Sequence, residues 1–338
     1  MAIQQMLLGG GAAPYPDVDS LFRHYKFTGS GYSETVQMLN NESGSGYTSG
    51  DGAAVWHWKE FGNDPYYFDT NDVAGELLIP SDQAPQYTGW QDSFEGWDSD
   101  KKNFYLGTNN GWASSGGSYA GWIFRKYEKF MDMGEFTKSN NNAQTFNHSL
   151  GTTPYFLMVK RINNTTNAGW NEWMGWFSSE GATKHLDMSH SGALQTSTGA
   201  WNDTNPTSTQ FTLGQYFVSG TYKYWIWPQY GEHINCGYYN GSSSNVSVMT
   251  SSDGTAGKAW KPQAITIRRL DAGEPWMWFD TGRGLATNTQ KAKYMNSNSG
   301  DGGSNRVNLT STGFTALAGN TFQNGNGNKY FYMAIREP

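Results

Sequence analysis

Two histidines and an aspartate form the first group in this sequence that could support chemistry. The segment "HLDMSH" places His185 and His190 five residues apart, with Asp187 between them. Imidazole and carboxylate groups are common ligands of zinc. On a β-strand, however, successive side chains alternate between faces, so positions five apart point in opposite directions. The HExxH spacing of zinc-dependent proteases is also absent. We therefore predict ordinary structural histidines and no metal site.

Carboxylate pairs could support glycoside hydrolysis, which needs two acids about 5 to 9.5 Å apart across a cleft. Acids at alternate positions of one strand would share a face, but the sequence contains no such pattern. Instead Glu60, Asp69, Glu76 and Glu172 stand apart from one another, and "WDSDKK" reads as a solvated loop. The GxSxG motif of a serine nucleophile is missing as well. We predict that the protein is not an enzyme, and a glycan hydrolase or lyase stays the alternative.

Calcium is the one cofactor for which the loops of the sequence contain suitable ligands. The segments "SGDGGSN" and "NDTN" are rich in the oxygen ligands that Ca²⁺ prefers. No EF-hand spacing surrounds them, and Asp, Asn and Gly are also the residues that tight turns require. We predict no cofactor, with a bound Ca²⁺ as the less favoured alternative.

Aromatic residues are the most informative feature, with 15 Trp, 20 Tyr and 18 Phe. Four tryptophans lie in polar loops: Trp90, Trp97, Trp112 and Trp201. An exposed indole beside hydrogen-bonding groups suits a sugar ring, while tryptophan is also enriched where subunits meet. These four residues are therefore candidates for glycan binding or for contact with a neighbouring subunit, and we favour the subunit contact.

Charge and composition exclude several classes of partner. The net charge is −6 and no cluster of Lys or Arg stands out, which argues against nucleic-acid binding. The single cysteine, Cys236, cannot form an intrachain disulfide. No apolar run approaches the length of about 18 residues that a membrane span needs. Forty-two glycines among many aromatics indicate short strands joined by turns.

A repeat of roughly 105 residues organises the chain. The phrase "YAGWIFRK" at Tyr119 returns as "YKYWIWPQ" at Tyr222 and "YFYMAIRE" at Tyr330. Four weaker landmarks recur in the same order; one of them is "AVWHWKEF", which returns as "YFLMVKRI" and "AITIRRLD". Ordered recurrence of five signals predicts three tandem units. The tryptophans at repeat positions are expected to be core residues: Trp56, Trp58, Trp122, Trp176, Trp225 and Trp278.

Each unit has the period-2 pattern of β-strands. In "AVWHWKEF" the alternation predicts that Trp56 and Trp58 point inward and His57 outward. Six to eight short strands per unit favour an all-β fold of antiparallel sandwiches or jelly rolls. We predict an N-terminal arm over residues 1–18 and three sandwich domains over residues 19–127, 128–231 and 232–338. Because the linkers are short, a semi-rigid rod of three domains is expected.

The segments "YAGWIFRK … MDMGEFTKSNNNAQTFNHSLGTTPYFLMVKRIN" and "PWMWFDTGRGL … STGFTALAG … YFYMAIREP" resemble a repeat of virion structural proteins from marine bacteriophages, notably cyanophages. The resemblance covers nearly the whole chain. It implies compact, concanavalin-like β-sandwiches in tandem on a fibre, tail or capsid surface. The opening "MAIQQMLLGGG" is also similar to the start of such proteins. The family offers no catalytic pattern to carry over.

This resemblance implies a structural protein on the outside of a virion, on the tail or the capsid. We expect the N-terminus to dock on other virion proteins through Met6, Leu7 and Leu8. The sandwiches would then serve as a tail fibre or appendage for adhesion, with host surface glycans as the candidate ligand. A homo-oligomer is expected, with a trimer favoured because fibres are commonly trimers. A capsid-decoration protein without a receptor role, or a carbohydrate-active enzyme on the same fold, are the alternatives.

Overall fold

The structure, a computed structural model, describes residues 15–38, 52–60, 64–109, 111–163, 171–190, 192–285, 292–297 and 306–338. In these residues nearly all regular structure is antiparallel β-sheet, which confirms the all-β prediction. The named strands form six sheets, and none of the six contains strands from distant thirds of the chain. We call the three resulting pairs of sheets lobe 1 (22–125), lobe 2 (132–228) and lobe 3 (234–336).

Lobe 1 pairs a large sheet with a small one. The large sheet has the order β1 (Phe22–Thr28), β7 (Ser118–Arg125), β3 (Ala53–Lys59), β4 (Tyr66–Asp69). The small sheet has the order β2 (Glu34–Gln37), β6 (Asn103–Leu106), β5 (Phe94–Trp97). Both sheets contribute to one apolar cluster, so the lobe has the two-layer build of a β-sandwich.

Lobes 2 and 3 repeat this arrangement. In lobe 2 the large sheet runs β13 (Gln195–Thr196), β12 (Lys184–Asp187), β11 (Met174–Phe177), β10 (Pro154–Arg161), β15 (Gly220–Pro228), β8 (Asp132–Lys138), and β14 (Gln210–Leu213) pairs with β9 (Gln144–Asn147). In lobe 3 it runs β16 (Ile234–Asn240), β23 (Lys329–Arg336), β18 (Pro262–Arg269), β19 (Met277–Asp280), β20 (Lys293–Tyr294), with a small sheet of β17 (Val246–Met249), β22 (Gly313–Ala316) and β21 (Val307–Thr310).

Short helical turns complete the described regular structure. They are η1 (Val18–Ser20), α1 (Thr198–Trp201), η2 (Ala256–Lys258), η3 (Thr281–Arg283) and α2 (Thr321–Asn324). Among the described residues, no helix has the length and apolar character needed to cross a membrane.

The pairing registers of the central strands show that the lobes are built alike. The phrase that introduced the repeat forms β7, β15 and β23, each hydrogen-bonded to the middle strand β3, β10 or β18. Corresponding cross-strand pairs are Trp56 with Trp122, Met158 with Trp225, and Thr266 with Met333. These registers define which residues of the three lobes occupy equivalent positions.

A tyrosine opposite a glycine marks the first strand pair of every lobe. The pairs are Tyr25 with Gly121, Tyr224 with Gly134, and Tyr332 with Gly237. A side chain on each glycine would run into the tyrosine ring, at 2.3, 3.0 and 2.7 Å respectively. The tyrosine therefore covers the space that the glycine leaves. In lobe 1 the tyrosine is on the first strand, β1, and the glycine is on β7. In lobes 2 and 3 the glycine is on the first strand and the tyrosine is on its partner, so the contact is kept with the two residues exchanged.

The three large sheets are buried on both faces. One face of each sheet packs on the small sheet of its own lobe, and the other face contributes to a cluster shared by all three lobes. In β3, Trp56 and Trp58 face this shared core, while Val55 faces the core of lobe 1. The predicted outward position of His57 is wrong, because its side chain is fully buried between Tyr25 and Trp112.

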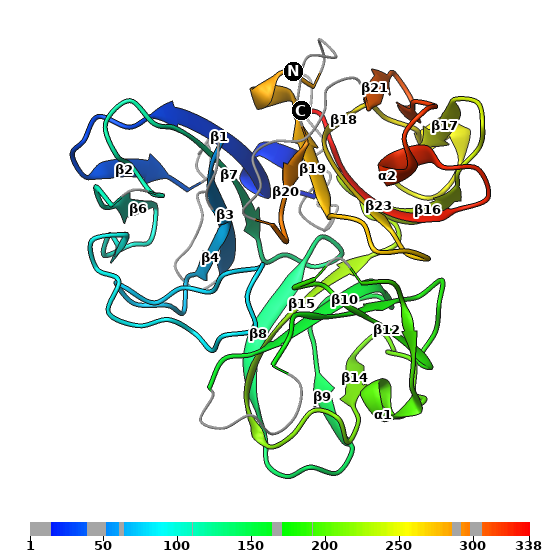
Figure 1. The fold of residues 1–338 in the computed structure, drawn as a ribbon, viewed down its shortest axis with the longest axis horizontal. Coiled ribbons are helices and arrows are strands. Elements are labelled where there is room, and N and C mark those ends of the chain that lie inside the picture. Colours follow the sequence, from blue (N-terminus) through cyan, green and yellow to red (C-terminus); the bar gives the residue numbers. More distant parts are fainter. Residues whose placement is uncertain are drawn as a thin grey trace, which may run out of the picture.

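The shared core overturns the expected rod. Figure 1 shows three lobes arranged around a common centre instead of in a row. Aromatic rings from different lobes meet there, with Trp122 stacked on Trp278 at 4.2 Å and Trp56 at 6.4 Å from Trp227. All six tryptophans predicted from the repeat to be core residues are buried. Since the sheets expose apolar residues on two faces, a single sandwich cannot bury them alone, and the lobes pack together.

The segment before β1 lies against the junctions between lobes. Tyr15 donates a hydrogen bond to the carbonyl of Glu128 at 2.9 Å, and the carbonyl of Pro16 lies 2.8 Å from Nε2 of His233. Met6, Leu7 and Leu8, the predicted docking residues, lie outside the described residues. The predicted domain boundaries fall between β7 and β8 and between β15 and β16, and they stay a prediction.

A shared core predicts that the three lobes unfold together. Trp227 is 2% exposed and contacts Trp56 of lobe 1 and Phe156 of its own lobe. Replacing Trp227 by Ala should cost about 3–5 kcal/mol of the free energy of unfolding. Calorimetry and urea unfolding followed by fluorescence should show one transition in both proteins. Two or three separated transitions would contradict this prediction, and Tyr216→Ala, at a residue that is 41% exposed, is the control.

Candidate functional site

The four loop tryptophans do not form one surface. Trp112 and Trp201 are each 1% exposed, so neither can bind a sugar or a neighbouring subunit, and the prediction is wrong for them. Trp112 stacks on Tyr66 at 4.4 Å, and Trp201 donates its indole N–H to the carbonyl of Lys184. Trp90 and Trp97 are partly buried, and they stay candidates. Polar neighbours in the sequence concealed the burial, because the loop of Trp112 and the helical turn that ends at Trp201 pack against the sandwich cores.

The two histidines of "HLDMSH" do not share a strand, because β12 ends at Asp187, so the argument from strand alternation applies to His185 alone. His185 is buried on β12, while the exposed His190 follows the strand and places Nδ1 2.8 Å from Oδ2 of Asp187. Of the two loops considered for calcium, "SGDGGSN" lies outside the described residues. In "NDTN", Asn202 and Asp203 adopt left-handed backbone conformations, as turn residues do.

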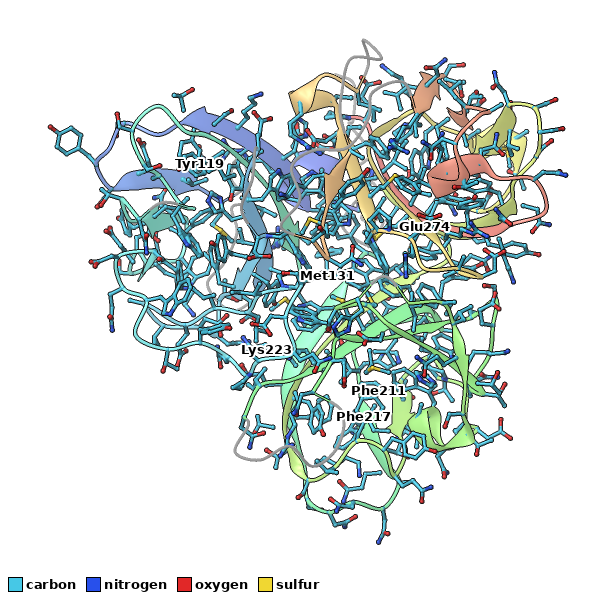
Figure 2. The ribbon with its side chains drawn as sticks, in the orientation of Figure 1. Tyr119, Met131, Phe211, Phe217, Lys223 and Glu274 are labelled. Carbon is cyan, nitrogen blue, oxygen red and sulfur yellow. The ribbon has the colours of Figure 1, made fainter. Side chains whose placement is uncertain are left out.

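A buried charge cluster joins lobe 1 to lobe 2. Lys223 of β15 extends its ammonium group to Asp69, at 2.7 Å, and to Asp72, and all three side chains are at most 2% exposed. Glu135 lies 3.4 Å from the same nitrogen. Figure 2 shows Lys223 at the boundary between the two lobes. The prediction that Asp69 stands isolated is wrong, because Asp69 and Asp72 share the ammonium group of Lys223, which is 154 residues away from Asp69 along the chain.

Hydrogen bonds complete the cluster. Tyr67 donates to Asp69 at 2.7 Å and accepts from the indole N–H of Trp225 at 2.6 Å. Gln86 donates to Asp72 at 2.6 Å. In the described part of the chain, Asp69, Asp72 and Glu135 are the one group of three acidic, histidine or cysteine ligands close enough to hold a metal ion. The lysine ammonium already occupies the position of a cation there, so the cluster is a structural tie.

The pKa values follow from burial and from an imbalance of charge. Burial beside Asp69 raises the pKa of Asp72 to about 7, although Lys223 opposes the shift. Burial alone would lower the pKa of Lys223, but the attraction of the two carboxylates is stronger and raises it. One lysine cannot neutralise two carboxylates, so the cluster takes up a proton at a pH where a solvated aspartate would be ionised.

The other two lobe boundaries use the same positions with different chemistry. The registers make Phe177 and Asp280 the equivalents of Asp69, and Phe331 the equivalent of Lys223. Phe177 of lobe 2 therefore meets Phe331 of lobe 3, with ring centroids 5.0 Å apart. Asp280 of lobe 3 accepts from the indole N–H of Trp122 in lobe 1 at 3.0 Å. Each lobe thus contacts the next in a closed cycle.

Arg283 strengthens the boundary between lobes 3 and 1. Its Nε lies 2.7 Å from Asp280, and its guanidinium lies over the ring of Trp58 in lobe 1. Burial alone would raise the pKa of Asp280, yet Arg283 and the bond from Trp122 lower it. This carboxylate is therefore ionised at neutral pH and satisfied by fixed partners, which leaves it no role in proton transfer.

A depression lies where all three lobes meet, and we call it the polar bowl. It has a volume of about 450 Å³ and is lined by Asp64, Ile79, Ser81 and Asp82 of lobe 1, Ser189 and His190 of lobe 2, and Asn296 and Ser297 of lobe 3. This volume is within the range of about 300–1,000 Å³ that is usual for ligand sites. No sequence pattern indicates the bowl, because its residues come from loops that only the packing of the lobes brings together.

A smaller apolar space, which we call the central cavity, lies next to the bowl. Its volume is about 40 Å³, and its walls include Trp56, Trp173, Trp276 and Trp278. Asn296 lines both spaces. The cavity belongs to the shared core, and it is too small for a ligand of its own.

The comparison with known protein families matches residues 131–338 to the "Domain of unknown function (DUF7483)". The chain belongs to the DUF7483 family. The matched segment begins at the residue before β8 and contains lobes 2 and 3. No curated protein matches the chain. Within this DUF7483 member, lobe 1 has the same arrangement of sheets as the two matched lobes although the match does not extend to it.

The charge cluster predicts a large effect of removing Lys223. Replacing Lys223 by Met leaves two carboxylates buried without a cation, and the free energy of unfolding should fall by about 3–5 kcal/mol. Urea unfolding at neutral pH measures this loss. The matched control is Lys102→Met, which removes an exposed lysine paired with Asp100 and should leave stability nearly unchanged. Equal, small losses in both variants would contradict a desolvated cluster.

The raised pKa of Asp72 predicts a pH-dependent difference between two proteins. Asp72 of the folded state binds a proton up to about pH 7, whereas in the unfolded chain it loses that proton near pH 4. Ionisation of Asp72 therefore lowers wild-type stability as the pH rises from 4 to 7, by at most about 1.4 kcal/mol per unit. Asp72→Asn lacks this contribution.

The measurement is the stability of Asp72→Asn minus that of the wild type, taken by urea unfolding from pH 4.5 to 8.5. This difference should rise up to about pH 7 and then level off. A difference that is constant across the range would show that Asp72 has an ordinary pKa.

Proposed function

We propose that this protein is a structural component of a bacteriophage virion, a tail fibre or surface appendage, whose lobes present a rigid surface for adhesion to host glycans. The observation that best supports this proposal is the closed cycle of three sandwiches around one aromatic core. We call this arrangement of three lobes the block. Its lobes have little freedom to move relative to one another, so the outer loops are held in fixed relative positions. Loops held rigidly in this way suit the binding of a ligand better than an enzyme mechanism in which parts of the protein must close over a substrate.

The carboxylates support binding over catalysis. Asp69, Asp72 and Asp280 are buried in ties between lobes and face no cleft. In the polar bowl, burial alone would raise the pKa of Asp82, but hydrogen bonds from Tyr87 and the backbone lower it. A carboxyl group that ionises so readily is a poor general acid at neutral pH. The carbohydrate-active enzyme therefore remains the weaker alternative.

In this proposal the N-terminal residues, with Met6, Leu7 and Leu8, attach the block to other virion proteins on the particle exterior. The contacts of Tyr15 and Pro16 with the lobe junctions would hold the end of this arm, where it joins lobe 1, against the three lobes. A homotrimer stays part of the proposal for the assembled appendage. Capsid decoration would use the same block without adhesion.

Deletion of residues 1–14 tests the attachment. The truncated chain keeps Tyr15 and Pro16, so we expect an unchanged melting temperature together with at least tenfold lower incorporation into particles. Quantitative immunoblotting of purified particles gives the readout, and Met6→Ser with Leu7→Ser and Leu8→Ser is the finer variant. Normal incorporation of the truncated protein would refute the arm as the attachment, and absence of the wild-type protein from particles would refute the virion assignment.

A further inference from the structure

The polar bowl has the chemistry of a site for a hydroxylated ligand. Its lining offers carboxylate oxygens, hydroxyl groups, an imidazole and an amide, and no lysine or arginine is among the described residues that line it. Anionic ligands such as phosphate usually require such cations. A neutral ligand that both donates and accepts hydrogen bonds fits this set better.

Internal hydrogen bonds hold the lining in place while leaving capacity for a ligand. Asp64 accepts from Ser81 at 2.6 Å with one of its two oxygens. Asn296 accepts from the backbone N–H of Trp276 at 2.8 Å and donates to the carbonyl of His190 at 3.0 Å. Its amide still has a second N–H, and Asp64 has a second oxygen. Groups fixed in this way lose little freedom when a ligand binds.

The floor of the bowl separates it from the central cavity by one residue from each lobe. Pro80, Met188 and Met295 line the cavity, and the next residue along the chain in each case, Ser81, Ser189 or Asn296, lines the bowl. Tyr67, Gly175 and Trp278 occupy equivalent positions in the three lobes. Each of them pairs with a residue that lies two positions before the floor residue of its lobe, so the three floor residues are equivalent as well. Two of them are methionines, whose flexible side chains adapt readily to a new neighbour.

The central cavity suits a small apolar group. Aromatic and methionine side chains make up most of its wall, and a cavity of this character does not hold water well. About 40 Å³ accommodates a methyl group but not a ring. An apolar substituent that enters through the methionine floor would give the wall side chains additional dispersion contacts.

We propose that the polar bowl binds one sugar ring that carries a substituent ending in a methyl group, such as an acetamido group, with the ring in the bowl and the methyl group at the cavity. This inference rests on the adhesive part of the proposed function and specifies its ligand class. The hydroxyl groups of the ring would meet Asp64, Asp82, His190 and Ser297. The amide of the substituent would meet Asn296, beside the floor.

The test compares two pairs of sugars on the purified full chain by saturation-transfer NMR and calorimetry. The probes are N-acetylglucosamine against glucose, and N-acetylgalactosamine against galactose. We expect at least one N-acetylated sugar to bind about fourfold or more tightly than its parent. A fourfold difference in affinity corresponds to the free energy of burying one methyl group. Equal affinities within both pairs would overturn the role of the cavity, and no binding of any of the four would overturn the site.

Two variants locate the binding. His190→Ala removes an exposed side chain of the bowl and should weaken both sugars of the better pair at least threefold; Gln210→Ala, exposed on β14, is its control. Met295→Phe fills the cavity and should abolish the preference for the N-acetylated sugar. Its control is Met249→Phe, at a methionine that is 41% exposed. Wild-type binding in both His190→Ala and Met295→Phe would place the sugar elsewhere, and Trp90→Ala and Trp97→Ala would then test the two remaining loop candidates.

The outcome is separable from that of the proposed function. If the protein is found on particles and attaches to host cells, yet His190→Ala changes neither sugar binding nor attachment, the inference fails and the proposed function stands. If the sugars bind as expected but the protein is absent from particles, the virion assignment fails and the binding site stands.

Discussion

The shared aromatic core is the constraint on which the rest of the structure depends. Each large sheet has apolar side chains on both faces, and its own small sheet can cover only one of them. The second face must be removed from water by another protein surface, and the other two lobes provide it. Three sheets around one centre satisfy this requirement for every lobe at once, whereas a linear row would leave the outer faces of the end sheets uncovered.

Polar ties at the lobe boundaries determine how the lobes fit together. An apolar core alone tolerates several packings, because hydrophobic contact has little directional preference. The cluster of Lys223 with Asp69 and Asp72, and the contact of Asp280 with Trp122, are satisfied in one arrangement only. Buried ion pairs are costly to desolvate and add little net stability, so we attribute to them a role in specificity. The third boundary, where Phe177 meets Phe331, lacks a tie at this position.

Sequence patterns predicted what depends on neighbours along the chain and missed what depends on packing between lobes. Period-2 alternation located β3, β10 and β18, and the repeat identified β7, β15 and β23 as equivalent strands. The same alternation misplaced His57, because nothing local distinguishes an outward residue from one that faces a second core. The pairing of Asp69 with Lys223 could not be inferred, although one signal was available: Lys223 is a lone lysine within the apolar phrase "YKYWIW". Trp112 and Trp201 had polar neighbours and are buried nonetheless, since flanking residues do not report where a loop folds.

One chain with three lobes can differ at positions that a homotrimer must keep identical. The floor positions are Pro80, Met188 and Met295, and the residues that follow them are Ser81, Ser189 and Asn296. In three identical subunits, a central depression would present the same set of groups three times, so an asymmetric ligand could bind in three equivalent orientations. Because the three lobes differ in sequence, these orientations are no longer equivalent. The difference in sequence supplies carboxylates from lobe 1, an imidazole from lobe 2 and an amide from lobe 3, so that a ligand in the bowl would meet different chemistry on each side.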